Sequence, residues 1–357
     1  MAKRIVVFGA TGYTGRLIAE RLVAAGVRPV LAGRSAERLE TLASQLGGLE
    51  TVRADAMRAN TVFEVADSAD VLISTVGPFM KWGLPAVRAA VAAGCTYLDT
   101  TGEPEFIRRV FEEFGPPASR SGAALLTAMG YDFAPGVLAG ALALAEAPDA
   151  VRVDVGYYAL GGGPTSLSSG TRESVVGVTL GDGHAYRDGR VVTVRPAERV
   201  RSFQVAGKSR DAISVGGSEH FVLPAWHAAL REVNVYLGWF GPLARPLQAG
   251  SFAGSWVRRV PGVRPAMRIA GERALGFVGG EPGGTRSWIA AEALDASGRA
   301  LSVVNLTGVD GYEFTASFVA WAAQRSVSGV GAIGPVQAYG LEAFEAGARV
   351  AGLERLR

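Results

Sequence analysis

The sequence predicts an α/β fold, and three features near its beginning indicate this class. A short apolar run, Ile5–Phe8, is followed by three glycines spaced three residues apart and then by helical periodicity up to Gly26. Apolar runs return at Pro29–Ala32, Leu49–Arg53 and Asp70–Thr75, each after a segment long enough for a helix. This alternation of strands and helices predicts a doubly wound parallel sheet of the Rossmann type.

The composition is that of a folded protein of about two domains. Of its 357 residues 48% are hydrophobic and 19% charged, which is enough apolar material for a sizeable core. The formal net charge is only +3 and no run of Lys or Arg exceeds two residues, so we expect no nucleic-acid partner. The single cysteine, Cys95, excludes an internal disulfide and a thiolate metal site. The three histidines lack zinc-site spacing, and we expect no metal.

The apolar stretch Gly122–Ala147 is the best candidate for a membrane span, but its pattern argues against one. Asp132 and Pro135 interrupt it, which favours a buried strand, a turn and a buried helix. No apolar leader precedes the first strand. We therefore expect a cytoplasmic protein without a membrane span.

The first turn reads Gly9-Ala-Thr-Gly-Tyr-Thr-Gly15 and lies between a strand and a helix. Its glycines allow a tight turn and close approach of a pyrophosphate, and the N–H groups at the start of the helix attract an anion. We expect a dinucleotide site here rather than a turn that binds nothing. The expected pyrophosphate contacts are Gly9, Thr11, Gly12, Tyr13, Thr14 and Gly15.

The end of the second predicted strand favours NADP(H) over NAD(H). NAD-binding versions carry an Asp or Glu here for the ribose 2′-hydroxyl, whereas this chain has Gly33-Arg34-Ser35. A guanidinium and a hydroxyl can hold a phosphate, so we expect Arg34 and Ser35 at the 2′-phosphate. Arg38, one helical turn later, would assist them. The alternative is that the arginines only solvate the start of a helix.

Two further strand ends complete the expected cofactor site. Asp55 follows the third predicted strand, where it would lie beside adenine or cap a helix that starts near Met57. The fourth strand leads into Val76, Gly77 and Pro78. Because ligands bind at the carboxyl ends of parallel strands, we expect these three residues beside the nicotinamide.

Polar residues also follow the fifth and sixth predicted strands. Asp99 and Glu103 could supply an acid, but the simpler interpretation is that they bond the loop backbone and cap a helix beginning near Pro104. Tyr131 and Asp132 interrupt the apolar stretch before a helix. Asp132 suits the N-cap of that helix, and Tyr131 could face the cofactor as a proton donor. Our catalytic candidates are therefore Tyr131 first and Asp132 second.

Several of these segments together resemble the saccharopine dehydrogenase-like reductase superfamily, including its trans-acting enoyl reductase branch. The resemblance implies a Rossmann domain that binds NADP(H), a second α+β domain with a mixed sheet, and a C-terminal helix that returns to the first domain. We expect these parts at residues 1–133, 134–330 and 331–357. The segments that carry the resemblance are Gly9–Gly15, Ala32–Ser35, Gly77–Phe79, Gly83–Pro85, Gly94–Glu103 and Gly130–Pro135.

The second half carries weaker signals. Alternation predicts a strand over Val151–Ala159, Asp188-Gly189 is typical of a hairpin turn, and His220 is expected to lead into an apolar strand as a structural residue. A further hairpin is expected over 286–308, helices over 315–324 and 335–353, and a lid over the Gly/Ser-rich residues 161–171. The apolar run 233–243 would line a substrate pocket, bury a dimer interface, contact lipid or belong to the ordinary core. In the lipid case a basic rim would follow it, made of Arg258, Arg259, Arg264 and Arg268.

These observations predict an NADPH-dependent oxidoreductase that transfers hydride to an enoyl, imine or keto group. We expect a small-molecule substrate of apolar, acyl or lipid-like character, and a homodimer. The alternative is a non-catalytic NADP(H)-binding or sensor protein. A typical short-chain dehydrogenase site is excluded, because none of Lys3, Lys81 and Lys208 has a Tyr four residues before it.

Overall fold

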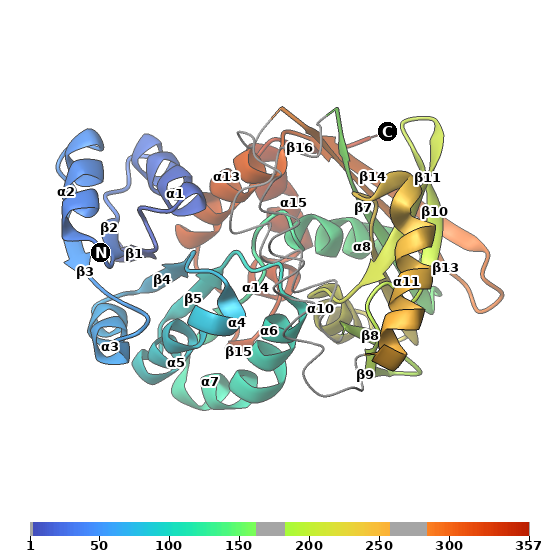
Figure 1. The fold of residues 1–357 in the computed structure, drawn as a ribbon, viewed down its shortest axis with the longest axis horizontal. Coiled ribbons are helices and arrows are strands. Elements are labelled where there is room, and N and C mark those ends of the chain that lie inside the picture. Colours follow the sequence, from blue (N-terminus) through green and yellow to red (C-terminus); the bar gives the residue numbers. More distant parts are fainter. Residues whose placement is uncertain (1–2, 162–182, 258–283, 357) are drawn as a thin grey trace. The chain divides into compact units, whose positions relative to one another are not determined.

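The computed structural model describes residues 3–161, 183–257 and 284–356 (Figure 1). Contacts divide the chain into two compact units, which we describe one at a time. Compact units need not coincide with functional domains, so the expected domain boundaries stay a prediction. Unit 1 comprises Met1–Thr101, Phe106–Ala134 and Tyr312–Gly352, and unit 2 comprises Gly102–Glu105, Pro135–Gly311 and Leu353–Arg357.

Unit 1 is built on a parallel sheet. Among the described residues it has seven strands in the order β15-β6-β5-β4-β1-β2-β3. Strands β1, β2 and β4 are buried along their whole length, as expected where helices cover both faces. The predicted doubly wound sheet is confirmed, and the strand order reverses between β1 and β4. The strands are β1 (Ile5–Phe8), β2 (Val30–Gly33), β3 (Thr51–Arg53), β4 (Val71–Ser74), β5 (Thr96–Asp99), β6 (Ala124–Leu126) and β15 (Gly331–Ala332).

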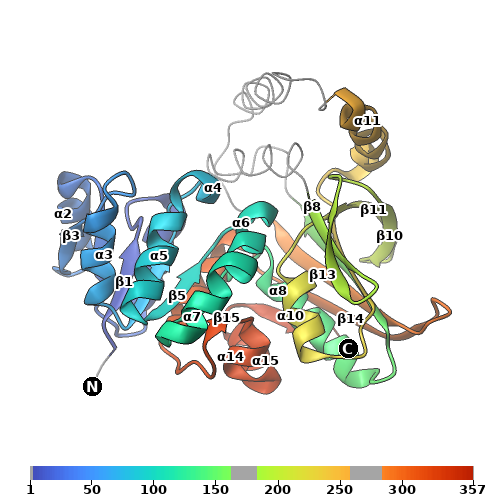
Figure 2. The ribbon, with the colours of Figure 1, turned by 90° about the horizontal axis from the view of Figure 1, so that it is seen from below.

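Helices cover both faces of this sheet. α1 and α2 lie on one face, and α3, α5 and α7 lie on the other (Figures 1 and 2). In α1 the buried residues Gly15, Ile18, Ala19 and Leu22 recur at helical spacing, so the apolar periodicity seen in the sequence is the packing face. The helices are α1 (Tyr13–Ala24), α2 (Ala36–Gln45), α3 (Ala59–Asp67), α4 (Phe79–Trp82), α5 (Leu84–Ala93), α6 (Pro104–Arg109), the π-helix Val110–Phe114 and α7 (Gly115–Ser121).

The C-terminal part of the chain returns to unit 1 through three helices, α13 (Gly311–Ala323), α14 (Pro335–Tyr339) and α15 (Leu341–Val350). Arg21 of α1 pairs with Glu313 of α13 at 3.3 Å. The return of the C-terminal helix is therefore confirmed.

The single helix expected over 335–353 is wrong in detail. Gly340 has a φ of +78°, which separates α14 from α15, because this left-handed backbone conformation cannot continue a helix. After α15 the chain forms a short strand, β16 (Leu353–Arg355), which pairs with β14 of the other sheet.

Unit 2 contains the expected mixed sheet. Within the described residues it has nine strands, β10-β11-β12-β7-β13-β14-β16 with the β8–β9 hairpin joined to β12. The pair β7–β12 is parallel, whereas the hairpins are antiparallel. The strands are β7 (Arg152–Leu160), β8 (Gly183–Arg187), β9 (Arg190–Val194), β10 (Val200–Val205), β11 (Lys208–Val215), β12 (Glu232–Leu237), β13 (Arg286–Leu294) and β14 (Ala300–Gly308).

Side chains alternate between the two faces of β7. The Tyr157 hydroxyl accepts the Gly136 N–H of α8 at 2.8 Å and donates to Glu219 of α10 at 2.6 Å. On the opposite face, the buried Asp154 accepts hydrogen bonds from Arg152 and Asn234. The helices of this unit are α8 (Ala134–Glu146), α10 (Glu219–Trp226), the 3₁₀ turn Gly241–Leu243 and α11 (Ala244–Val257).

Two expectations for unit 2 have clear outcomes. The Asp188-Gly189 hairpin is confirmed, with φ of +50° and +79° at its two turn residues. The strand expected after His220 is wrong, because this segment forms α10. The expected lid over 162–171 and Arg258, Arg259, Arg264 and Arg268 lie outside the described residues. None of the helices in the described ranges combines the length and the hydropathy needed to cross a membrane.

Candidate functional site

The turn between β1 and α1 leaves no space for a side chain at Gly9 or Gly15. Gly9 has a φ of +93°, and a Cβ on it would lie 2.6 Å from Thr75 Oγ1. A Cβ on Gly15 would lie 2.3 Å from the Gly9 carbonyl oxygen. The Thr75 hydroxyl lies 3.2 Å from the Phe8 and Gly9 carbonyl oxygens. It therefore joins the end of β4 to the turn.

The start of α1 presents its N–H groups to an incoming anion. Gly12 is the N-cap residue, and among the described residues no side chain caps the helix. The first turn carries no acidic residue. Gly12 is exposed, and Thr11 and Thr14 are half-buried beside it. An uncapped helix start over a turn of bare backbone fits the pyrophosphate of a dinucleotide. Tyr13, 45% exposed, packs edge-on against Tyr312 with ring centroids 5.1 Å apart.

Arg34, Ser35 and Arg38 lie at the carboxyl end of β2. The Arg34 side chain is exposed. Ser35 caps α2, and its hydroxyl accepts the Arg38 N–H at 3.4 Å. The Arg38 guanidinium donates to the Thr11 carbonyl oxygen at 2.9 Å. Arg38 therefore does more than solvate a helix start, since it links α2 to the glycine turn.

Asp55 shapes the turn that follows β3. Its Oδ1 accepts the Met57 N–H at 3.0 Å, and its own N–H donates to Thr61 Oγ1 at 2.9 Å. Helix α3 begins only at Ala59, with Arg58 as its N-cap residue. The interpretation of Asp55 as the cap of a helix near Met57 is therefore wrong. Its placement beside adenine stays a prediction.

Val76, Gly77 and Pro78 follow β4, the strand next to β1. A Cβ built on Gly9 would lie 3.0 Å from Val76 Cγ2, so Val76 borders the glycine turn. Gly77 is exposed, and Pro78 is the N-cap residue of α4. The ends of β1 and β4 thus meet at the point where the strand order reverses, where open α/β sheets bind ligands.

Tyr131 and Asp132 lie in the turn between β6 and α8. Strand β6 is two positions from β4 in the same sheet, so this turn belongs to the same carboxyl edge. The Tyr131 N–H donates to Thr315 Oγ1 of α13 at 2.9 Å, and the Phe133 N–H donates to the Ala128 carbonyl oxygen at 3.2 Å. Tyr131 is 8% exposed.

Asp132 lies two residues before α8, so that Phe133, and not Asp132 as expected, directly precedes the helix. The helix begins at Ala134, and Asp132 Oδ1 is buried without a hydrogen-bond partner among the described residues. Burial raises the pKa of this carboxyl to about 7. A carboxyl group with this pKa keeps its proton up to near-neutral pH and can donate it.

Asp99 fixes the ends of β5 and β6 together. Its Oδ1 accepts the N–H groups of Thr101 at 3.0 Å and Ala128 at 2.9 Å, and its Oδ2 accepts the Thr127 hydroxyl at 2.8 Å. Burial raises the pKa of Asp99 to about 6, although these hydrogen bonds act against the rise. The interpretation that Asp99 bonds the loop backbone is thus confirmed, and α6 begins at Pro104 as expected.

Three residues that sequence reasoning did not assign to the site also hold it together. Thr75 joins β4 to the glycine turn, Thr315 holds the Tyr131 turn, and Asp99 holds the end of β6. Thr75 could have been found from its position at a strand end, and Asp99 was expected to bond the loop backbone but not to hold the end of β6. Thr315 gave no such signal, since it lies 184 residues from its partner.

Two comparisons of the amino-acid sequence each cover part of the chain. Residues 9–98 match a family model described as NAD(P)H-binding. A trans-acting enoyl reductase of Mycobacterium tuberculosis is 40% identical over 137 residues, which are 37% of this chain and 33% of that protein. One from Mycobacterium ulcerans is 39% identical over the same length and shares. The match thus spans about a third of the length of these relatives.

The fold of the whole chain has a counterpart among solved structures. The apo saccharopine dehydrogenase (L-Glu forming) from Saccharomyces cerevisiae superposes with a TM-score of 0.59, 12% identity and 100% coverage of both chains. The chain therefore has the fold of saccharopine dehydrogenase, its residues 9–98 match an NAD(P)H-binding family model, and a stretch of 137 residues is similar to part of the trans-acting enoyl reductases.

Proposed function

We propose that this protein is an NADPH-dependent reductase that transfers hydride to an enoyl, imine or keto group of a small molecule. The observation that carries the proposal is the glycine turn of β1 and α1. Gly9 and Gly15 leave no room for a Cβ there, and no described side chain caps the start of α1, within the segment that matches NAD(P)H-binding proteins. When bound, NADPH supplies a hydride from C4 of its nicotinamide.

Residues at the ends of β1, β2 and β3 bind three different parts of the cofactor. The turn from Gly9 to Gly15 binds the pyrophosphate. The Arg34 guanidinium and the Ser35 hydroxyl bind the 2′-phosphate, while Arg38 keeps α2 close to the turn. Asp55 lies by the adenine. No carboxylate follows β2 directly, and this supports NADPH over NADH.

Val76, Gly77 and Pro78 border the nicotinamide half of the cofactor in this proposal, since they follow the strand next to β1. Reduction of a double bond also requires a proton at the atom that does not receive hydride. Tyr131 and Asp132 lie at the same sheet edge as possible donors. The buried Oδ1 without a partner among the described residues and the raised pKa of Asp132 favour Asp132 as the donor.

The substrate class rests on the relatives. They are named trans-acting enoyl reductases, which favours an acyl chain with a carbon–carbon double bond over a ketone or an imine. The match covers only about a third of these proteins. Their activity therefore does not transfer directly, and we propose enoyl reduction for this chain.

The test is turnover of NADPH by the purified full-length chain with a panel of enoyl thioesters, ketones and cyclic imines. We expect loss of NADPH absorbance with at least one enoyl thioester. The control variant Gly15→Ala, in which the added Cβ has no space, should show none. Tight NADPH binding without turnover of any member of a broad panel would instead support the non-catalytic sensor. Absence of NADPH binding would contradict both functions.

A further inference from the structure

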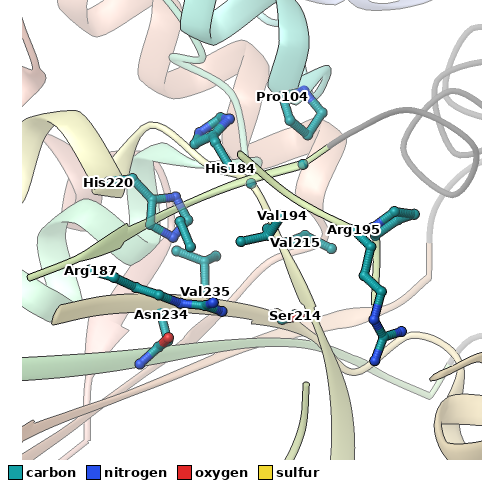
Figure 3. A pocket seen from close by; sticks show the side chains of 14 residues that line it. Pro104, His184, Arg187, Val194, Arg195, Ser214, Val215, His220, Asn234 and Val235 are labelled. Carbon is teal, nitrogen blue, oxygen red and sulfur yellow. The ribbon is translucent and has the colours of Figure 1, made fainter. Parts of the chain in front are cut away.

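A cavity in unit 2 is too small for an organic ligand. It lies between the β8–β9 hairpin, strands β11 and β12 and the start of α10 (Figure 3). Its volume is about 20 Å³, which is room for about one water molecule. A larger ligand needs a site that is open to solvent, such as the carboxyl edge of the sheet in unit 1, where Arg53 lies.

Arg53 ends β3, the strand next to β2, and is paired with Gly33 in the register of these two strands. The Ala54 N–H donates to the Gly33 carbonyl oxygen at 2.9 Å, which fixes this register. Neighbouring strands lie about 5 Å apart, and paired residues point to the same face of a sheet. The Arg53 side chain therefore leaves the sheet on the face to which a side chain at Gly33 would point.

That face of the sheet carries α2 and the glycine turn. A Cβ on Gly33 would lie 3.7 Å from Leu39 Cδ2 of α2 and 4.0 Å from Thr11 Oγ1. The Arg38 guanidinium of α2 donates to the Thr11 carbonyl oxygen at 2.9 Å. Because Gly33 has no side chain, none from this position of β2 stands between Arg53 and the residues proposed for the 2′-phosphate.

The charges at this end of β2 and β3 suit a phosphate group. Arg34 and Arg53 are exposed, and neither forms an ion pair or a hydrogen bond within the described part of the chain. Residues 33–38 together with Arg53 contain three arginines and one acidic residue, Glu37, which leaves two positive charges in excess. A phosphate monoester carries a charge of about −1.5 to −2 at neutral pH. The excess positive charge therefore matches one phosphate monoester.

We propose that Arg53 determines the preference for NADPH together with Arg34, by binding the 2′-phosphate from the β3 side. This inference rests on the proposed function, to which it adds a second guanidinium from a different strand. A guanidinium can form two parallel hydrogen bonds to a phosphate, so arginines on β3 and after β2 would hold the phosphate from two sides. NADH carries only a hydroxyl group at this position and gains little from Arg53.

The test is a fluorescence titration of the full chain with NADPH and with NADH, with competition by adenosine 2′,5′-bisphosphate and by adenosine 5′-monophosphate. Arg53→Met should weaken the binding of NADPH and of the bisphosphate about tenfold, because charge-assisted hydrogen bonds are lost. The affinities for NADH and for the monophosphate should not change. The melting temperature should stay that of the wild type, because Arg53 is exposed. Arg53→Gln repeats the test if Arg53→Met does not fold.

Arg58→Met is the matched control, since Arg58 is an exposed arginine in the turn after β3 and its removal changes the net charge equally. At high salt, which screens distant charges, it should bind NADPH like the wild type, whereas Arg53→Met should still bind NADPH more weakly. An equal loss in both variants, or an equal loss for NADPH and NADH in Arg53→Met, would overturn the role of Arg53.

The wild-type chain separates this inference from the proposed function. If the wild type prefers NADPH and Arg53→Met keeps the full preference, the role of Arg53 is overturned and the proposed cofactor stands. If the wild type binds neither nucleotide, or binds NADH as tightly as NADPH, the proposed cofactor is overturned and this inference with it.

Discussion

The guanidinium of Arg38 donates a hydrogen bond to the carbonyl oxygen of Thr11 at 2.9 Å. This bond connects the first turn of α2 to the glycine turn that follows β1. The residues proposed for the 2′-phosphate and for the pyrophosphate are thereby held at a fixed separation before any cofactor arrives. Such preorganisation reduces the cost of ordering these groups on binding.

Replacement of Arg34 by Ala should weaken NADPH binding at least tenfold and leave NADH binding unchanged, because only NADPH carries the phosphate that Arg34 would bind. The measurement is a fluorescence titration with each nucleotide. Arg88→Ala, at an exposed arginine of α5, is the control. An equal loss for both nucleotides would remove Arg34 from the 2′-phosphate.

Gly15→Ala should destabilise the protein by about 1–3 kcal/mol, since the new methyl group would overlap the Gly9 carbonyl oxygen. It should also abolish nucleotide binding, which needs the turn intact. Urea unfolding and NADPH titration check the two effects. Gly250→Ala in α11, where a Cβ meets no atom within 4 Å, should not destabilise. Normal NADPH binding by Gly15→Ala would contradict the claim that the close packing of Gly15 against Gly9 is needed for nucleotide binding.

Asp132→Asn should lower the turnover rate about 100-fold, the usual loss when a catalytic acid is removed. The wild-type rate should fall as the pH rises through about 7, where Asp132 loses its proton. The variant should lack this decline. Rates from pH 5 to 9 for Asp132→Asn and Tyr131→Phe separate the two donors. If the decline persists in Asp132→Asn and disappears in Tyr131→Phe, Tyr131 is the donor.

Asp99 should make the protein more stable in mild acid. Its pKa in the folded state, about 6, lies above the value of about 4 in an unfolded chain. The folded protein thus holds this proton more tightly. The stabilisation is complete below about pH 4 and is lost as the pH rises through 6, by about 3 kcal/mol in all. Urea unfolding from pH 4 to 7 should show this slope in the wild type, and a smaller slope in Asp99→Asn. Equal slopes in the wild type and in Asp99→Asn would contradict this role of the Asp99 proton.

The sequence was most informative where local pattern and local function coincide. The glycine turn, the buried strands β1, β2 and β4 and the Asp188-Gly189 hairpin all follow from residues within about ten positions of one another. Each of these features is determined by backbone sterics or by burial on both faces. Both constraints produce a recognisable residue pattern within a short stretch of sequence.

Errors arose where distant contacts decide the structure. His220 begins a helix, because a short apolar run does not distinguish a strand from a buried helix. Asp132 lies two residues before the start of α8 and not next to it, and Thr315 holds the neighbouring Tyr131 from another part of the chain. The three residues of β16 carry too little pattern to show that they join β14. These outcomes depend on tertiary contacts between distant residues, which cannot be seen in a short stretch of sequence.

The most direct measurement is the ratio of the dissociation constants of NADPH and NADH for the wild-type chain, obtained by fluorescence titration in one buffer. We expect saturable binding of both nucleotides, with NADPH bound at least tenfold more tightly than NADH. Equal affinities, tighter binding of NADH, or no binding of either nucleotide would contradict it.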